Sequence, residues 1–346
     1  MLTCLLLPQQ RNILVMPNRI IFPEKGQVAL QRFELPALGP LDVSVRTLYS
    51  LMSIGTETII LHQRYDPDTH FAKMFSFPQL QTGVQAVGEI EAVGNQVAGL
   101  KVGDRVFMRM AHGSHQVQPA GACSRVPEGI DLKAACWCGL AKTAYRAAAA
   151  APFTKDAHVL IIGAGPVGQM AIRWASTVGV RTIASVDLSD IRLKHAEIGG
   201  ANLLLCGGIA EQIDRVNEIN AGKGPSVIVD ATGNADVFKH ALAAASMFSK
   251  VLLLGDTGYP GRQRLTSDVM SKGLSVQAVH DSHDFHGGTQ QEIDARFFAS
   301  VQAGQFDLSG LITHEYSPVD CADAYQLADQ QREDVMGLLY DWSQVD

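Results

Sequence analysis

The chain has 346 residues, of which 47% are hydrophobic and 18% charged, so it can bury a large core and does not have a disordered composition. Its net charge of -7, with no block of like charges, argues against a nucleic-acid partner and against an anionic membrane surface. The apolar runs have the length of strands, and the N-terminus is too weak for a signal peptide, so we expect a cytoplasmic protein.

The six cysteines are scattered along the chain, and the closest pair is Cys136 and Cys138. This C-x-C spacing fits neither a zinc ribbon nor a thioredoxin-type motif. We therefore expect reduced cysteines that pack as small hydrophobic residues.

Residues from about 19 to 130 predict a β-rich domain, a barrel or a sandwich. The segments "QVALQRFELP", "LDVSVRTLYS", "VGEIEAVG" and "VGDRVFMRM" predict short strands separated by Gly, Pro and Asp. The first residues, "MLTCLLLPQQRN", are compatible with a leading strand or with an extended start.

The pattern changes near Asp131. An alanine-rich run, "LKAACWCGLAKTAYRAAAAA", predicts one long helix that ends at Pro152. Strands and helices then alternate, and the six strands are apolar on both faces, as in buried parallel sheets. The fold class is therefore α/β, with a doubly wound parallel sheet beside the β-rich domain. After about residue 287, two helices and a last strand are expected to return to the first domain. This organisation predicts one domain over 1–140 with 288–346, and a second over 141–287.

A glycine-rich loop opens the predicted parallel sheet. In "VLIIGAGPVGQMAIRWA", Gly163, Gly165 and Gly168 have the G-x-G-x-x-G spacing, directly after an apolar strand and at the start of an amphipathic helix. The first glycine permits a tight turn, the second lets the backbone approach a pyrophosphate, and the third packs helix against strand. The segment predicts a dinucleotide site in which the helix N-terminus faces the phosphates.

Asp187 ends the next predicted strand, 19 positions after Gly168. A carboxylate there accepts hydrogen bonds from ribose hydroxyls and repels a 2′-phosphate, which favours NAD over NADP. We expect Arg192 to cover the adenine side. The alternative is a glycine turn followed by an aspartate that caps a helix.

Several motifs together resemble the medium-chain dehydrogenase/reductase superfamily, in its zinc-type alcohol and polyol dehydrogenase-like form. They include "KVGDRV", "GAGPVGQMA", "VDLSDIRLKHAEIGGA", "VDATG" and "GRQRLTSDVMSKGLSVQAVH". The resemblance implies a GroES-like catalytic domain, a Rossmann domain and a homodimer or homotetramer. It also implies that the cofactor contacts Pro166 and Val167 in the loop and further residues around the nicotinamide, namely Thr143, Ala231, Thr232, Gly233, Leu254 and Ala278.

The zinc ligands of that family are where this chain departs from it. Ile54 stands in the position of the first ligand, a cysteine, and Val84 in that of the second, a histidine; Cys138 resembles the third. A catalytic zinc needs three protein ligands. The structural zinc lobe is also missing, since only Cys123 lies in that region. We therefore predict that no metal is bound.

Without zinc, hydrogen-bond donors must stabilise the substrate oxygen. By resemblance, Thr56 contacts that oxygen and is the first candidate for the proton relay. Glu57 is expected to orient the loop or pair with an arginine, with direct acid–base chemistry as the alternative. His280 is either a proton carrier beside the nicotinamide or a loop histidine bonded to the backbone. Cys138 is either a proton donor or a packed thiol.

Two groups of histidines are candidates for metal ligands or substrate contacts, and neither role is expected. The run "HDSHDFH", with His280, His283 and His286, does not have a spacing typical of zinc sites. His112 and His115 are expected on a surface loop.

Taken together, the sequence predicts a zinc-independent, NAD-linked oxidoreductase that interconverts a small polar, polyol- or sugar-like alcohol and its carbonyl. One alternative is an NAD(P)H-dependent quinone or enone reductase. The other is a nucleotide-binding homologue that has lost catalysis.

Overall fold

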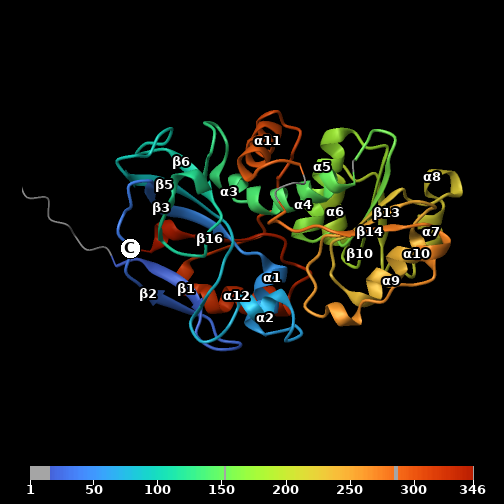
Figure 1. Cartoon of the computed structure of the whole chain (residues 1–346), viewed down its shortest axis with the longest axis horizontal. Coiled ribbons are helices and arrows are strands. Elements are labelled where there is room, and N and C mark those ends of the chain that lie inside the picture. The colour runs from blue at the N-terminus through green and yellow to red at the C-terminus, as the bar shows by residue number, and fades with distance from the viewer. Residues whose placement is uncertain (1–15, 152, 284–286, 346) are drawn as a thin grey trace, which may run out of the picture.

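The computed structural model describes residues 16–151, 153–283 and 287–345. The predicted leading segment and His286 therefore lie outside the described residues. The chain forms two halves side by side, one rich in antiparallel strands and one built on a parallel sheet (Figure 1). The first corresponds to the GroES-like domain expected from the sequence, and the second to the Rossmann domain.

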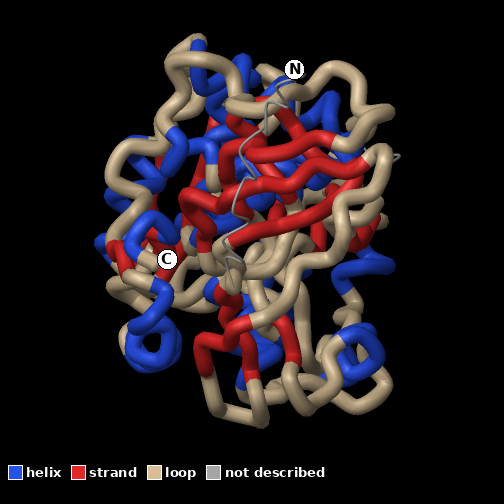
Figure 2. The backbone as a smooth tube through the Cα atoms, turned by 90° about the vertical axis from the view of Figure 1, so that its left-hand side faces the viewer, coloured by secondary structure: helices blue, strands red, loops and turns tan. Residues whose placement is uncertain are grey.

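The β-rich half contains two sheets, whose strands face the viewer in Figure 2. The smaller sheet has the order β2-β1-β4, with β1 at Asn18–Phe22, β2 at Ala29–Arg32 and β4 at Leu80–Gln81. The larger has the order β15-β16-β3-β5-β6-β8, and β7 also pairs with β3. Its strands are β3 Asp42–Leu51, β5 Ala86–Val93, β6 Arg105–Met108, β7 His115–Pro119, β8 Cys123–Arg125, β15 His314–Tyr316 and β16 Leu338–Asp341.

The C-terminal tail returns to this half, as the sequence predicts. Strand β16 pairs antiparallel with β3, so that Leu339 lies opposite Leu51. Helix α12 (Cys321–Gln330) packs on α1 (Ile54–Leu61), and the short α2 (His70–Met74) lies nearby. Helix α11 (Gln290–Gln302) covers the boundary between the halves (Figure 1).

The second half is a doubly wound sheet of six parallel strands, in agreement with the predicted fold class. The order is β11-β10-β9-β12-β13-β14, which in chain order is 3-2-1-4-5-6. The strands are β9 His158–Ile162, β10 Thr182–Asp187, β11 Leu203–Cys206, β12 Val227–Asp230, β13 Lys250–Leu253 and β14 Ser275–Ala278. The helices are α5 Pro166–Val178, α6 Asp190–Ile198, α7 Ile213–Asn217, α8 Ile219–Gly222, α9 Ala235–Ala244 and α10 Asp268–Ser271.

The predicted long alanine-rich helix is divided in two, which corrects the sequence-based expectation. Helix α3 covers Leu132–Ala135 and α4 covers Cys138–Ala150. Between them, Trp137 is fully buried and packs so closely on Gly337 that a Cβ at residue 337 would lie 2.6 Å from its ring. Burial of this large ring against the C-terminal segment accounts for the break in the helix.

One hydrophobic core runs through both halves by way of α4. It contains Leu51 and Phe107 from the antiparallel sheet, Ala141 from α4, and Ile161 and Met170 from the parallel-sheet half. No helix in the described ranges is long and apolar enough to cross a membrane.

Candidate active site

The glycine-rich loop has the close packing that its spacing predicts. Gly163 has a φ of +91°, and a Cβ at Gly168 would lie 1.9 Å from the Gly163 carbonyl oxygen. A Cβ at Gly165 would meet only Arg192 Nη1, at 3.7 Å. Helix α5 begins at the next residue, Pro166, so its free N–H groups face the open side of the loop.

Asp187 ends β10 directly beside this loop. One carboxylate oxygen accepts the Ala164 N–H at 2.7 Å, and the other accepts the Ser189 N–H at 2.9 Å. The carboxylate is therefore held in place by backbone donors and remains partly exposed. Arg192 donates a hydrogen bond to the Arg332 carbonyl, so it links the loop to the β-rich half.

The remaining predicted cofactor residues lie at one edge of the parallel sheet. Ala231, Thr232 and Gly233 follow β12, Leu254 follows β13, and Ala278 ends β14. Ligands of open α/β sheets bind at this carboxyl edge of the strands. The Thr232 hydroxyl donates to Asp230 at 2.6 Å, and burial raises the pKa of that aspartate.

Gly55, Thr56 and Glu57 form the first turn of α1 rather than a loop. Thr56 is half-buried, and its hydroxyl forms no hydrogen bond to another described residue. Glu57 is 1% exposed and accepts hydrogen bonds from Ser53 N–H at 2.6 Å and Thr82 Oγ1 at 2.7 Å. Tyr325 donates to the same carboxylate.

The ionisable partner of Glu57 is a histidine and not an arginine, so of the two expected roles the orienting one agrees with the structure. His112 Nε2 lies 3.2 Å from the carboxylate, and its exposed fraction is 0%. His112 is therefore not on the surface loop that the sequence suggests. Burial by itself would raise the pKa of Glu57, but His112 and the hydrogen-bond donors outweigh it and lower that pKa.

A further chain of hydrogen bonds holds His112 from behind. Its Nδ1 lies 2.7 Å from Ser50 Oγ, and that hydroxyl accepts the Trp342 indole N–H at 2.8 Å. The network thus joins α1, β3 and the C-terminal tail. His115, in β7, is half-buried beside Glu91, and burial lowers its pKa.

The three positions that resemble zinc ligands do not form a set of ligands. Ile54 and Val84 carry no ligand atom. Cys138 is fully buried next to Asp294, and burial raises the pKa of its thiol well above the usual value. These residues do not fit a catalytic zinc, which needs three ligands and an open position. Cys138 has the environment of a packed thiol.

A cluster of polar side chains lies close to these positions. Asp281 accepts from Arg109 Nη2 at 2.7 Å, and Lys142 Nζ lies 3.0 Å from its other oxygen. Thr143 Oγ1 is 3.4 Å from the same carboxylate. The buried Asp294 is also within electrostatic reach of Lys142, and burial raises the pKa of that aspartate. The Lys142 side chain is only 5% exposed. Sequence reasoning placed Thr143 at the cofactor but missed Arg109 and Lys142.

Gln85 lies against the same end of α4. Its Oε1 accepts the Leu140 N–H at 3.2 Å, and a Cβ at Gly139 would lie 2.4 Å from Oε1 and 3.0 Å from Arg109 Nη1. Gln85 is fully buried, yet its Nε2 has no hydrogen-bond partner among the described residues. A buried donor without a partner is costly, so an acceptor atom that reached this amide would relieve that cost.

His280 follows β14 at the same edge of the sheet, as expected. Its Nδ1 lies 2.8 Å from Ser282 Oγ, and its ring packs edge-on against His70 at a centroid distance of 5.9 Å. Desolvation lowers the pKa of His280, although Asp256 and Asp281 oppose the shift. A neutral imidazole is therefore favoured near pH 7.

Comparison with known proteins agrees with this architecture. The family described as alcohol dehydrogenase GroES-like domain matches residues 40–159, and the family described as zinc-binding dehydrogenase matches residues 166–293. An alcohol dehydrogenase from Cupriavidus necator is 23% identical over 93% of this chain and 98% of its own length. The chain therefore belongs to the medium-chain dehydrogenase/reductase superfamily of oxidoreductases.

Solved structures show the same fold. An Escherichia coli oxidoreductase of unknown specificity has a TM-score of 0.84 and 19% identity, and the match covers 94% of this chain and 99% of the other. An alcohol dehydrogenase of E. coli CFT073, solved with NADH, has a TM-score of 0.79 and 19% identity, with the same coverage.

The buried Glu57 carboxylate leads to a prediction about acid stability. We expect the variant E57Q to lose about 3 kcal/mol of folding free energy at pH 7, because an amide cannot accept all the hydrogen bonds that Ser53, Thr82 and Tyr325 donate to the buried carboxylate. Since the folded-state pKa of Glu57 is lowered from 4.5, its contribution is present above that pH and is lost as the pH falls below it. Urea unfolding at several pH values measures this. A difference between wild type and variant that stays constant down to pH 3.5 would contradict the assignment.

Proposed function

We propose that the chain is a zinc-independent, NAD(H)-dependent oxidoreductase that interconverts a small polar alcohol and its carbonyl. The observation that carries the proposal is the meeting of two features at one edge of the parallel sheet. One is the dinucleotide loop with Asp187, and the other is the donor cluster of Gln85, Arg109 and Lys142, which lies by the positions that resemble zinc ligands.

The loop fits a nicotinamide dinucleotide. Beside Gly165 only the Arg192 guanidinium lies within 4 Å of a Cβ position, so a pyrophosphate could approach the backbone there, and the start of α5 supplies N–H groups and a positive helix end. The Asp187 carboxylate would accept hydrogen bonds from the ribose hydroxyls and would repel a 2′-phosphate. When bound, the nicotinamide accepts or donates the hydride.

The donor cluster would take the place of a metal at the substrate oxygen. Gln85 Nε2 offers an N–H that is already desolvated, and Arg109 and Lys142 supply positive charge nearby. Fixed donors of this kind stabilise a developing oxyanion because they need no reorganisation during the reaction. The polar lining supports a substrate that carries several oxygen atoms.

For the proton we propose Thr56, with His280 as the second candidate. The Thr56 hydroxyl forms no hydrogen bond to another described residue, and the lowered pKa of His280 favours a neutral imidazole near pH 7. Glu57 and Cys138 are assigned no proton transfer, because both are fully buried and hydrogen-bonded to other side chains. The homo-oligomeric state stays a prediction.

The first prediction of this proposal concerns the cofactor. We expect NADH to bind at least about tenfold more tightly than NADPH, because the Asp187 charge repels a 2′-phosphate. The variant D187N removes the charge and keeps an oxygen acceptor for one of the two backbone amides, so it should narrow the difference in affinity between NADH and NADPH. Fluorescence titrations with NADH and with NADPH measure the two affinities in the wild type and in D187N. Equal affinities in the wild type would contradict the role of Asp187.

The second prediction concerns the proton relay. We expect T56V to lower kcat by about 100-fold and to leave the NADH affinity unchanged, because general acid–base catalysis contributes on that scale. T58V is the matched control, since the Thr58 hydroxyl bonds the Ile54 carbonyl within the same helix. Turnover that is equal in the two variants would remove Thr56 from the mechanism.

The third prediction concerns the substrate oxygen. The variant Q85M keeps the length of the side chain but removes the N–H donor together with the oxygen that accepts the Leu140 N–H, and we expect kcat to fall by about 100-fold. The enzyme should turn over at its full rate after dialysis against a chelator.

A panel of ketoses, enones and quinones tests the substrate class. Preference for enones would favour the reductase alternative, and NADH binding without any turnover would favour a non-catalytic protein.

A further inference from the structure

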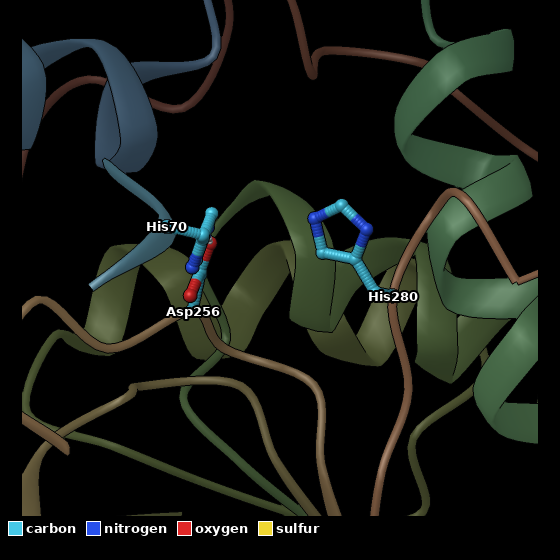
Figure 3. Close-up of side chains that lie close together, drawn as sticks. All are labelled: His70, Asp256 and His280. Atoms are coloured by element: carbon cyan, nitrogen blue, oxygen red, sulfur yellow. Dashed lines mark hydrogen bonds and ion pairs between the residues drawn. The ribbon is translucent and has the colours of Figure 1, made fainter. Parts of the chain in front are cut away.

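Three side chains from separate segments meet where the two halves of the chain adjoin. His70 begins α2 in the β-rich half, Asp256 follows β13, and His280 follows β14. One ligand atom from each residue lies within 4.8 Å of those of the other two. Figure 3 shows the three side chains converging from opposite sides of this boundary. Two imidazoles and a carboxylate form a ligand set that suits zinc and other transition metals.

The distances are close to those of a metal site. His70 Nε2 and Asp256 Oδ2 are 3.0 Å apart. Two ligand atoms at zinc bond lengths in a tetrahedral arrangement lie about 3.3 Å apart. The first two ligands therefore already have nearly the required spacing, and a rotation of the exposed His280 side chain brings in the third.

The orientation of His280 also fits this role. Its Nδ1 lies 2.8 Å from Ser282 Oγ, and Figure 3 shows its other ring nitrogen directed toward His70 and Asp256. The Ser282 N–H also lies 3.2 Å from Nδ1, and in that contact Nδ1 accepts. Binding of a metal through Nε2 therefore places the proton on Nδ1, where it is donated to Ser282 Oγ in place of that contact. Metal-binding histidines commonly donate their second ring nitrogen to such an acceptor.

The segments that carry the ligands are already in contact through their backbones. Asp66 N–H donates to the Gly258 carbonyl at 2.7 Å, and a Cβ at Gly258 would lie 2.0 Å from the Arg64 carbonyl oxygen. The position of His70 relative to Asp256 is therefore held by the fold. Their side chains are 46% and 30% exposed, so an ion from solvent can reach them.

We propose that His70, Asp256 and His280 bind one divalent transition-metal ion, with zinc as the first candidate, which bridges the two halves of the chain. An ion on His280 Nε2 excludes that imidazole from proton transfer, which leaves Thr56 as the proton carrier of the proposed reaction. Three protein ligands leave the fourth position to a water molecule. The ion ties the segment between α1 and α2 to the carboxyl edge of the parallel sheet. This site is separate from the positions of Ile54, Val84 and Cys138.

Calorimetric titration of the full, chelator-treated chain with zinc chloride tests the proposal, without nucleotide or substrate. We expect one saturable site in the wild type. H280A and D256A should each weaken it by about tenfold or more. The matched control is H62A, because His62 Nε2 lies 3.2 Å from Asp329 Oδ2 in a similar pair that lacks a second histidine. Its affinity for zinc should equal that of the wild type.

A second test measures the thermal unfolding midpoint of the protein in place of the heat of zinc binding. Because an ion that binds the folded state raises the unfolding midpoint, zinc should raise the Tm of the wild type and of H62A but not that of D256A. Absence of saturable binding in the wild type would overturn the proposal. Equal zinc affinities of the wild type, H280A and D256A would also overturn it. So would a loss of zinc affinity in H62A as large as the loss in H280A and D256A. Since no cofactor is present, these outcomes do not depend on the proposed enzymatic activity.

Discussion

The packing of α4 between the two sheets is the constraint on which the rest of the structure depends. Its small residues let it approach both halves, and the Trp174 indole donates to the Ala141 carbonyl at 2.8 Å to fix it against α5. The same helix sets the candidate active site, because Gln85 rests on its first turn at Gly139 and Lys142 reaches Asp281 one turn later. A side chain at Gly139 would displace both Gln85 and Arg109, so the close approach of the backbone is a condition for the donor cluster.

Burial separates the polar residues into two groups with different tasks. Glu57 and His112 have their hydrogen bonds satisfied by Thr82, Tyr325 and Ser50, far from solvent. A buried carboxylate costs desolvation, and the hydrogen bonds that Glu57 accepts offset that cost. The network joins α1 to the C-terminal tail, and it thereby positions the turn that carries Thr56. Glu57 therefore acts as a positioning residue, because it holds the helical turn that carries Thr56.

Local patterns in the sequence predicted the parts of the fold that local physics determines. The loop at Gly163, the acid at Asp187 and the return of the last strand each depend on a short segment, and the structure agrees with these placements. The buried state of His112 and the pairing of Lys142 with Asp281 depend on contacts between residues 55 and 139 positions apart, for which a single sequence carries no signal. The division between α3 and α4 belongs to the same class, because helix propensity favoured a continuous helix and burial of Trp137 prevailed.

In the proposed reaction, charges at the boundary between the halves would take the place of a metal ion at the substrate oxygen. A zinc ion supplies two positive charges at one point, whereas Arg109 and Lys142 supply two that Asp281 partly neutralises. The remaining charge is weaker and more spread out, so a donor within hydrogen-bond reach must do more of the stabilisation. The unpaired Nε2 of Gln85 has the required character, because it is desolvated before any substrate arrives. A substrate oxygen that satisfies this amide removes a cost already present in the folded chain, and that gain is largest when the oxygen carries most negative charge.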